Sequence, residues 1–168
     1  DEWKQVLPLL NRSCVVQVTL HPRIGKQQYK GEVNRAAFQA FYEACELPLV
    51  YNGDLRTLEA VQKLMDAYPR LKGVMLGRGL LADPSLARSI REGKAPDKAT
   101  LYRQVAEMHR LMYEHYSRTI EGGEAQLLAK LKTMWEYLLP DMEKKPRKAI
   151  LKSNRLDAYL RAVAEALR

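Results

Sequence analysis

The sequence has few cysteines and lacks long apolar runs. Its two cysteines, Cys14 and Cys45, match no metal-binding or redox spacing. Both lie in apolar stretches, so we expect reduced core thiols in a cytoplasmic protein, with no metal site. No apolar run approaches the roughly 20 residues that cross a bilayer, and no signal-peptide pattern is present, so we expect no membrane attachment.

Positive charge is what the sequence has in excess. Its 28 lysines and arginines outnumber 20 acidic residues and give a formal net charge of +8. Because 46% of the residues are hydrophobic and 29% charged, the chain has the composition of a folded domain. The charge favours a polyanionic partner such as RNA or DNA. The chain begins with Asp rather than Met, so we expect an N-terminus that was processed or cut.

Hydrophobic periodicity in the first half alternates between helix and strand. We expect helices at 2–11, 34–46, 57–68 and 84–92, and strands at 14–20, 48–51 and 71–76. Thr57 is expected to cap the helix that follows it. This alternation predicts a parallel sheet with right-handed crossovers. The nearly continuous apolar strands predict that both faces of the sheet are covered.

The second half reads as helical throughout. Residues 93–100 have the composition of a linker, and helices are expected at 101–120, at 124–139 and from about 153 onward. Their apolar stripes are typical of a helical bundle. The fold class is therefore α/β, with an α/β domain at 1–95 and an all-α domain at 96–168.

Each of the three expected strands ends in a loop with unusual chemistry. The carboxyl ends of parallel strands share one edge of the sheet, where ligands bind. Glycine loops offer backbone N–H groups to a phosphate, and a glycine after a strand can adopt positive φ and admit a ligand. An arginine adds a planar donor fork. The sequence therefore predicts a phosphate-bearing cofactor at His21-x-Arg23, Asn52-Gly53-Asp54 and Gly77-Arg78-Gly79.

Taken together, VTLHPRIGKQQYKGEV, PLVYNGD and GVMLGRGLLADPSL resemble the C-terminal half of the tRNA-dihydrouridine synthases. These are flavoenzymes with an FMN-binding TIM barrel followed by a helical tRNA-binding domain. The resemblance covers residues 1–90 motif by motif and residues 100–168 by architecture. It implies a partial TIM barrel of about three parallel β/α units, strands 6 to 8, and a helical tRNA-binding domain.

The resemblance also implies a role for each motif. His21 is implied to contact the isoalloxazine ring of FMN, and the ribityl-phosphate is implied to be held by Asn52, Gly53, Asp54, Gly77 and Arg78. The residues implied to face the target nucleotide are Arg23, Lys26, Gln28, Tyr29 and Lys30. The family reduces uridine in tRNA to 5,6-dihydrouridine, with NADPH or NADH as reductant and the flavin as hydride carrier. The target base must leave its stack.

The catalytic acid of that family is not expected in this chain. The family's proton-donating cysteine lies in the N-terminal half of the barrel, whereas Cys14 begins an expected strand and Cys45 ends an expected helix. Three β/α units cannot close a barrel, so strand edges and one apolar face would stay open. We therefore expect an inactive fragment of the full-length enzyme, or a half that self-associates through its open side.

A basic run near the C-terminus indicates RNA binding independently of the barrel motifs. Six positive charges fall within residues 144–155, namely Lys144, Lys145, Arg147, Lys148, Lys152 and Arg155. Contacts between such residues and phosphates supply salt-dependent affinity for tRNA. The alternative is a solvated basic loop between helices.

Two other functions remain open at this point. One is a different FMN-dependent TIM-barrel oxidoreductase, such as a dihydroorotate-dehydrogenase-like or ene-reductase-like enzyme, although the helical tail and its basic run count against it. The other is a non-catalytic RNA-binding module that keeps a vestigial barrel half, which the missing cysteine loop would also fit.

Overall fold

The computed structural model describes residues 2–28 and 30–168. The chain divides into two compact units, one that ends at Gly79 and one that begins at Leu80. The linker composition predicts a division at 95/96. The structure assigns residues 80–95 to the second unit, where the backbone N–H of Leu139 donates to the carbonyl of Ala82 over 2.9 Å.

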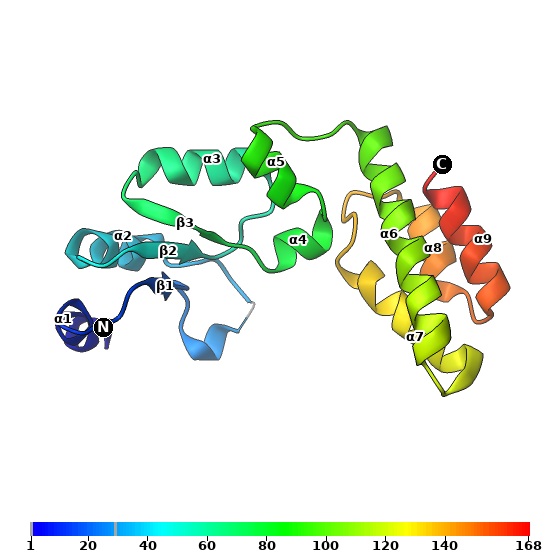
Figure 1. Ribbon diagram of the computed structural model, residues 1–168, viewed down its shortest axis with the longest axis horizontal. Coiled ribbons are helices and arrows are strands. Elements are labelled where there is room, and N and C mark those ends of the chain that lie inside the picture. The colour runs from blue at the N-terminus through cyan, green and yellow to red at the C-terminus, as the bar shows by residue number, and fades with distance from the viewer. Residues whose placement is uncertain (1, 29) are drawn as a thin grey trace. The chain divides into compact units, whose positions relative to one another are not determined.

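The N-terminal unit contains a parallel sheet of three described strands in the order β1-β2-β3 (Figure 1). Successive strands are hydrogen-bonded neighbours, as they are in a β/α barrel. The predicted parallel sheet is therefore confirmed, and the order agrees with a partial barrel. The elements are α1 (Trp3–Asn11), β1 (Val18–Leu20), the 3₁₀ turn η1 (Gly25–Gln27), α2 (Arg35–Ala44), β2 (Leu49–Asn52), α3 (Leu58–Ala67) and β3 (Leu71–Met75).

Strand β1 is shorter than the apolar run that predicts it. It begins at Val18, which pairs with Leu49, and not at residue 14. The residue just before β2 is Pro48, which has no N–H to extend the hydrogen-bond ladder between the two strands. Val16 consequently lies outside the sheet and is 85% exposed.

Helices cover one face of this sheet. Phe38 of α2 packs edge-on against Tyr51 of β2, with ring centroids 4.7 Å apart, and against Tyr68, 4.8 Å away. The opposite face carries Thr19, which is exposed, and Met75, which is 55% exposed. No described element of this unit covers that face, so the expectation of two covered faces is not met within it. The open face agrees with the expectation that three β/α units cannot close a barrel.

The predicted cap at Thr57 is confirmed, and the predicted thiol environments are confirmed only for Cys45. The Thr57 hydroxyl accepts from the N–H of Ala60 over 3.1 Å, so Thr57 caps α3 as expected. Cys45 is buried in the core, as predicted, whereas Cys14 is exposed. Cys14 precedes the shortened β1 and therefore has no sheet partner to bury it.

The C-terminal unit is a helical bundle, as expected (Figure 1). Its helix α7 ends at Thr133, earlier than the predicted 139, and residues 144–152 form a helix that the sequence pattern did not predict. Pro146 lies in the first turn of that helix, where proline is tolerated, and Ile150 is fully buried. The elements are α4 (Arg78–Ala82), which begins just before the unit boundary, α5 (Leu86–Glu92), α6 (Lys98–Thr119), α7 (Gly123–Thr133), the 3₁₀ turn η2 (Met134–Glu136), α8 (Lys144–Lys152) and α9 (Leu156–Ala166).

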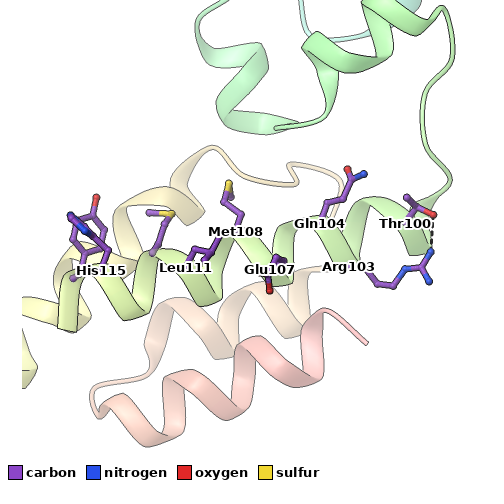
Figure 2. A pocket seen from close by; sticks show the side chains of 9 residues that line it. Thr100, Arg103, Gln104, Glu107, Met108, Leu111 and His115 are labelled. Carbon is purple, nitrogen blue, oxygen red and sulfur yellow. Dashed lines mark hydrogen bonds between the residues drawn. The ribbon is translucent and has the colours of Figure 1, made fainter. Parts of the chain in front are cut away.

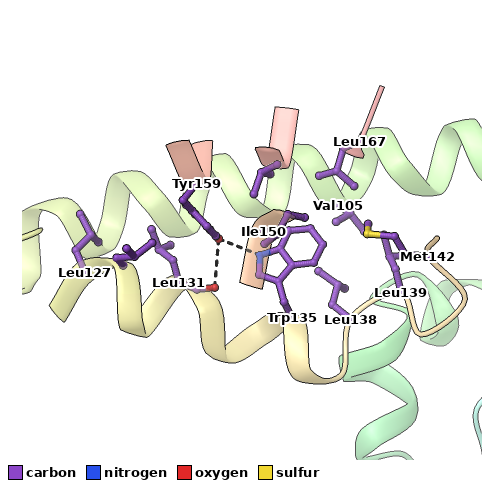
Figure 3. Close-up of a cluster of buried hydrophobic side chains, with 12 residues drawn as sticks. Val105, Leu127, Leu131, Trp135, Leu138, Leu139, Met142, Ile150, Tyr159 and Leu167 are labelled. Atoms are coloured by element: carbon purple, nitrogen blue, oxygen red, sulfur yellow. Dashed lines mark hydrogen bonds between the residues drawn. The ribbon is translucent and has the colours of Figure 1, made fainter. Parts of the chain in front are cut away.

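Trp135 and Tyr159 form the centre of this bundle, and both are fully buried (Figure 3). The indole Nε1 of Trp135 donates to the Tyr159 hydroxyl over 2.9 Å, so the polar atoms of both rings are satisfied inside the core. Within the described residues, no helix is both long and apolar enough to cross a membrane. The same residues contain no cluster of three or more His, Cys, Asp or Glu side chains placed to hold a metal ion.

Candidate functional site

A cavity of about 280 Å³ lies at the carboxyl ends of the three strands. All three predicted loops reach it, so the expectation that they converge on one edge is confirmed. The loop after β1 contributes His21. The loops after β2 and β3 contribute the other lining residues, which are Asn52, Gly53, Asp54, Leu55, Arg56, Met75, Gly77, Arg78 and Gly79.

Hydrogen bonds to Asn52 hold the three strand ends together. His21 Nδ1 donates to the carbonyl oxygen of Asn52 over 2.7 Å, because a carbonyl can only accept. The side-chain Nδ2 of Asn52 donates to the carbonyl of Met75 over 2.8 Å. The imidazole therefore has a defined tautomer and orientation at the cavity wall.

Asp54 is placed between two arginines. Its carboxylate accepts from Arg23 at 2.5 Å and from Arg78 at 2.8 Å. The Arg23 side chain is only 3% exposed, whereas those of Asp54 and Arg78 are 32% and 27% exposed. Arg23 thus lies behind the cavity wall and not at the surface where the resemblance implied a nucleotide contact, because the Asp54 carboxylate draws its guanidinium inward.

Gly53 is a glycine because of close packing, and not because the loop needs positive φ at this position. Among the described residues, the positive φ in this loop belongs to Asp54, at 48°, and not to Gly53. A Cβ at Gly53 would lie 2.9 Å from Cγ1 of Val33 and 3.0 Å from the hydroxyl of Tyr51. Glycine at 53 is therefore required for packing within the unit. Gly77 is uncrowded, since a Cβ there would meet no atom within 4 Å.

Arg56 is a lining residue that sequence reasoning missed. It is exposed and follows Asn-Gly-Asp by two positions in the same loop, and its charge next to that motif was the available signal. The cavity lining carries the charges of Arg56, Arg78 and Asp54, with the buried Arg23 behind it. The balance is positive, which suits an anionic ligand.

The other residues implied to face the nucleotide lie on the loop after β1. Lys26, Gln28 and Lys30 are exposed, and none of them lines the cavity. Tyr29 lies outside the described residues. Lys26 and Lys30 therefore place positive charge beside the strand ends, while His21 is the part of this loop that lines the cavity.

The basic run forms much of the surface of α8. Lys144, Lys145, Lys148 and Lys152 are exposed on it. Arg155 is also exposed and pairs with Asp157, with Nε and Oδ1 3.1 Å apart. The interpretation of this run as an irregular loop is wrong, because residues 144–152 are helical.

Arg147 differs from the lysines around it. Its guanidinium is half-buried and donates to the carbonyls of Trp135, Leu138 and Leu139 at 2.5, 2.6 and 2.6 Å. These carbonyls lie at and just after η2, and that of Leu139 also accepts from the N–H of Met142 over 2.9 Å. Arg147 therefore stabilises the bundle, and the exposed positive face of the run consists of the lysines and Arg155.

A second hollow, of about 680 Å³, runs along one face of α6 (Figure 2). Met108, Leu111 and Met112 supply its apolar lining, and Leu111 is 52% exposed. A single helix provides all its lining residues, and none of the site residues predicted from the sequence lies in it. The strand-end cavity is therefore the candidate cofactor site.

The comparisons with known proteins agree on one family. The family model described as "Dihydrouridine synthase (Dus)" matches residues 5–158. A probable tRNA-dihydrouridine synthase of Rhizobium leguminosarum is 29% identical over 111 residues, which cover 64% of this chain and 34% of the relative. The tRNA-dihydrouridine synthase B of Shewanella oneidensis is 25% identical over 114 residues, covering 68% and 35%.

A eukaryotic relative matches as well. The tRNA-dihydrouridine(20a/20b) synthase [NAD(P)+] of Schizosaccharomyces pombe is 25% identical over 92 residues, which cover 55% of this chain and 28% of the relative. The chain spans about one third of the length of the curated relatives it matches. Because the family model covers most of the sequence, the chain belongs to the dihydrouridine synthase family.

Proposed function

We propose that this chain supplies a cofactor-phosphate site and RNA-binding helices to a tRNA-dihydrouridine synthase. That enzyme would reduce uridine in tRNA to 5,6-dihydrouridine, with FMN as cofactor and NADPH or NADH as reductant. The observation that carries the proposal is the meeting of His21, Asn52 and Arg78 around one cavity. The names of the relatives support the reaction and its substrate.

The lining residues fit the anionic end of FMN. A phosphate carries up to two negative charges, and Arg56 and Arg78 bring two positive charges to the lining. The uncrowded backbone at Gly77 leaves room for an oxygen-rich group to approach. At about 280 Å³ the cavity lies just below the roughly 300–1,000 Å³ of pockets that enclose a whole ligand. We therefore assign to it the phosphate and ribityl part of the cofactor.

Each residue would have a definite task around this group. Arg78 would bind the phosphate, and Asp54 would orient the Arg78 guanidinium. Asn52 would hold the second and third strand ends at a fixed spacing, and His21, oriented by the Asn52 carbonyl, would face the flavin. When bound, the flavin supplies hydride transfer to the pyrimidine, which no side chain can perform.

The RNA would be bound by phosphate contacts. We propose the exposed face of α8, with Lys144, Lys145, Lys148 and Lys152, and also Arg155, as one contact surface. Lys26, Gln28 and Lys30 on the loop after β1 would face the nucleotide near the flavin. Such contacts position the substrate and carry no sequence information directly.

The proton donor for the reaction is not assigned to either cysteine. Cys45 is buried in the core behind the sheet. Cys14 precedes β1, at the opposite end of the strand from the cavity. We therefore propose that these residues bind and position ligands and do not complete the reduction by themselves.

Titration of the full chain with FMN, followed by quenching of flavin fluorescence, tests the cavity assignment. We expect saturable binding that weakens on the order of tenfold in Arg78→Gln, since a charged hydrogen bond is lost. The control is Arg12→Gln, which removes an exposed arginine that does not line the cavity. Absence of FMN binding, or equal losses in both variants, would contradict the proposal.

A further inference from the structure

Arg23 holds two loops with one guanidinium group. Its Nη1 and Nη2 donate to the two carboxylate oxygens of Asp54 over 3.2 and 2.5 Å. Nη2 also donates to the carbonyl of Gly31 over 2.6 Å. Because Asp54 follows β2 and Gly31 follows β1, this single buried side chain joins the two loops.

Asp54 extends the connection to the cavity. Its Oδ1 accepts from Arg78, which lines the cavity, so a buried and a cavity-facing guanidinium share one carboxylate. The fork between Arg23 and Asp54 is kept although Arg23 Nε is buried and has no hydrogen-bond partner within the described part of the chain. Buried donors rarely lack partners. The two hydrogen bonds to Asp54, and not a partner for Nε, therefore determine where the Arg23 guanidinium lies.

Gly31 belongs to a loop with its own hydrogen bonds. We call residues 24–28 and 30–33 the substrate loop, because its exposed Lys26, Gln28 and Lys30 are proposed to face the nucleotide. The N–H of Gln27 donates to the carbonyl of Ile24 over 3.0 Å, and that of Lys30 to the carbonyl of Gln27 over 2.8 Å. Among the described interactions, the bond from Arg23 to Gly31 ties this loop to the ion pair behind the cavity.

We propose that Arg23 is a positioning residue that couples anion binding in the cavity to the order of the substrate loop. This inference deepens the proposed function and rests on it. An anion beside Arg78 competes with Asp54 for that guanidinium and leaves the Asp54 carboxylate more dependent on Arg23. The stronger pair in turn holds Arg23 in the position from which it binds Gly31.

Linkage makes the effect reciprocal. If FMN orders the substrate loop for RNA, then FMN tightens RNA binding by the same factor by which RNA tightens FMN binding. Lysine at 23 would keep the positive charge but lose the planar fork that reaches Asp54 and Gly31 together. Arg23→Lys should therefore weaken the coupling while each ligand still binds on its own.

Amide hydrogen exchange on the unmodified full chain is the first test. Adding FMN should slow exchange at Gln27, Gln28 and Lys30 by about fivefold, the lower end of typical coupling factors. FMN that binds without protecting these amides overturns the inference and leaves the proposed function standing. A chain that binds no FMN overturns the proposed function itself. This test needs no variant and decides the question even if Arg23→Lys does not fold.

The second test measures the affinity for a tRNA transcript with and without FMN. We expect a coupling factor of about five or more in the wild type, and a factor near one in Arg23→Lys. Arg35→Lys, at an exposed arginine of α2, is the matched control and should keep the wild-type factor. If Arg23→Lys weakens RNA binding alone and leaves both FMN affinity and loop protection unchanged, Arg23 is a direct nucleotide contact and the inference is wrong. Equal coupling in all three proteins also overturns it.

Discussion

His109 Nε2 lies 2.8 Å from the hydroxyl oxygen of Tyr159 in the middle of the helical core. His109 is 5% exposed and Tyr159 is fully buried. The Tyr159 hydroxyl also receives the Trp135 indole N–H and lies 3.3 Å from the carbonyl of Leu131. Helices α6, α7 and α9 and the 3₁₀ turn η2 thus meet at one buried oxygen. The protonation of His109 therefore affects the stability of the bundle directly.

Acidification should destabilise the helical unit through His109. Burial lowers the pKa of His109 to about 4, against about 6.5 in an unfolded chain. The unfolded state then binds more protons between these values, so the stabilisation is complete above pH 6.5 and is lost as the pH falls toward 4. The free energy of unfolding should fall by up to about 3 kcal/mol over this window. Burial raises the pKa of Tyr159 to about 12, so that hydroxyl does not titrate there.

Urea unfolding at several pH values measures this dependence. A Trp3→Phe background leaves Trp135 as the only tryptophan, so its fluorescence reports on the helical unit alone. His109→Gln should flatten the profile between pH 4 and 6.5, whereas His115→Gln, at an exposed histidine of the same helix, should not. A profile that is equally steep in both variants would assign the effect to other groups.

Replacing Arg147 should destabilise the bundle, although it lies within the basic run. Arg147→Ala removes the donors to three backbone carbonyls and should cost about 2 kcal/mol, as expected for hydrogen bonds from a charged group. Lys148→Ala removes an exposed neighbour and should change stability by less than about 0.5 kcal/mol. Thermal unfolding followed by circular dichroism compares them, and equal effects would show that the inward contacts contribute nothing.

Charge reversal on α8 should weaken RNA binding and leave the fold intact. We expect the double variant Lys145→Glu, Lys148→Glu to bind a tRNA transcript at least about tenfold more weakly at moderate salt. The plot of log K against log salt should also become less steep, by the amount expected for the loss of about two phosphate contacts. Filter binding at several salt concentrations measures both quantities.

The control for this double variant carries the same change of charge in the other unit. Lys63→Glu, Lys72→Glu alters two exposed lysines of α3 and β3. If it weakens RNA binding as much as the α8 variant does, the effect is one of net charge and α8 is not a specific contact surface.

Arg56 should strengthen FMN binding from the cavity rim. Arg56→Gln removes one of the two cations in the lining and should weaken FMN binding on the order of tenfold. Lys63→Gln, at an exposed position of α3, should leave the affinity unchanged. Flavin fluorescence titrations measure the FMN affinity of both variants. An unaltered affinity in Arg56→Gln would show that Arg56 does not contribute to the site.

Local sequence signals determined much of the fold correctly. Thr57 marked the start of α3, Gly122-Gly123 marked the break after α6, and the alternation of helices and strands gave a parallel sheet. These features depend on capping, glycine and periodicity, which act within a few residues. The basic run at α8 was not recognised as a helix because its charges obscured the single anchor, Ile150, whose burial depends on the rest of the bundle.

By itself the sequence determined that His21, Asn52 and Arg78 come together, because the ends of parallel strands must share an edge. Only the tertiary structure decided what Arg23 and Arg147 do. Each is a charged residue in a polar segment, and its local pattern is the same whether it faces solvent or the interior. The carboxylate of Asp54 and the backbone carbonyls after α7 hold these two arginines in place. Such partners, distant in sequence, are brought near only by folding.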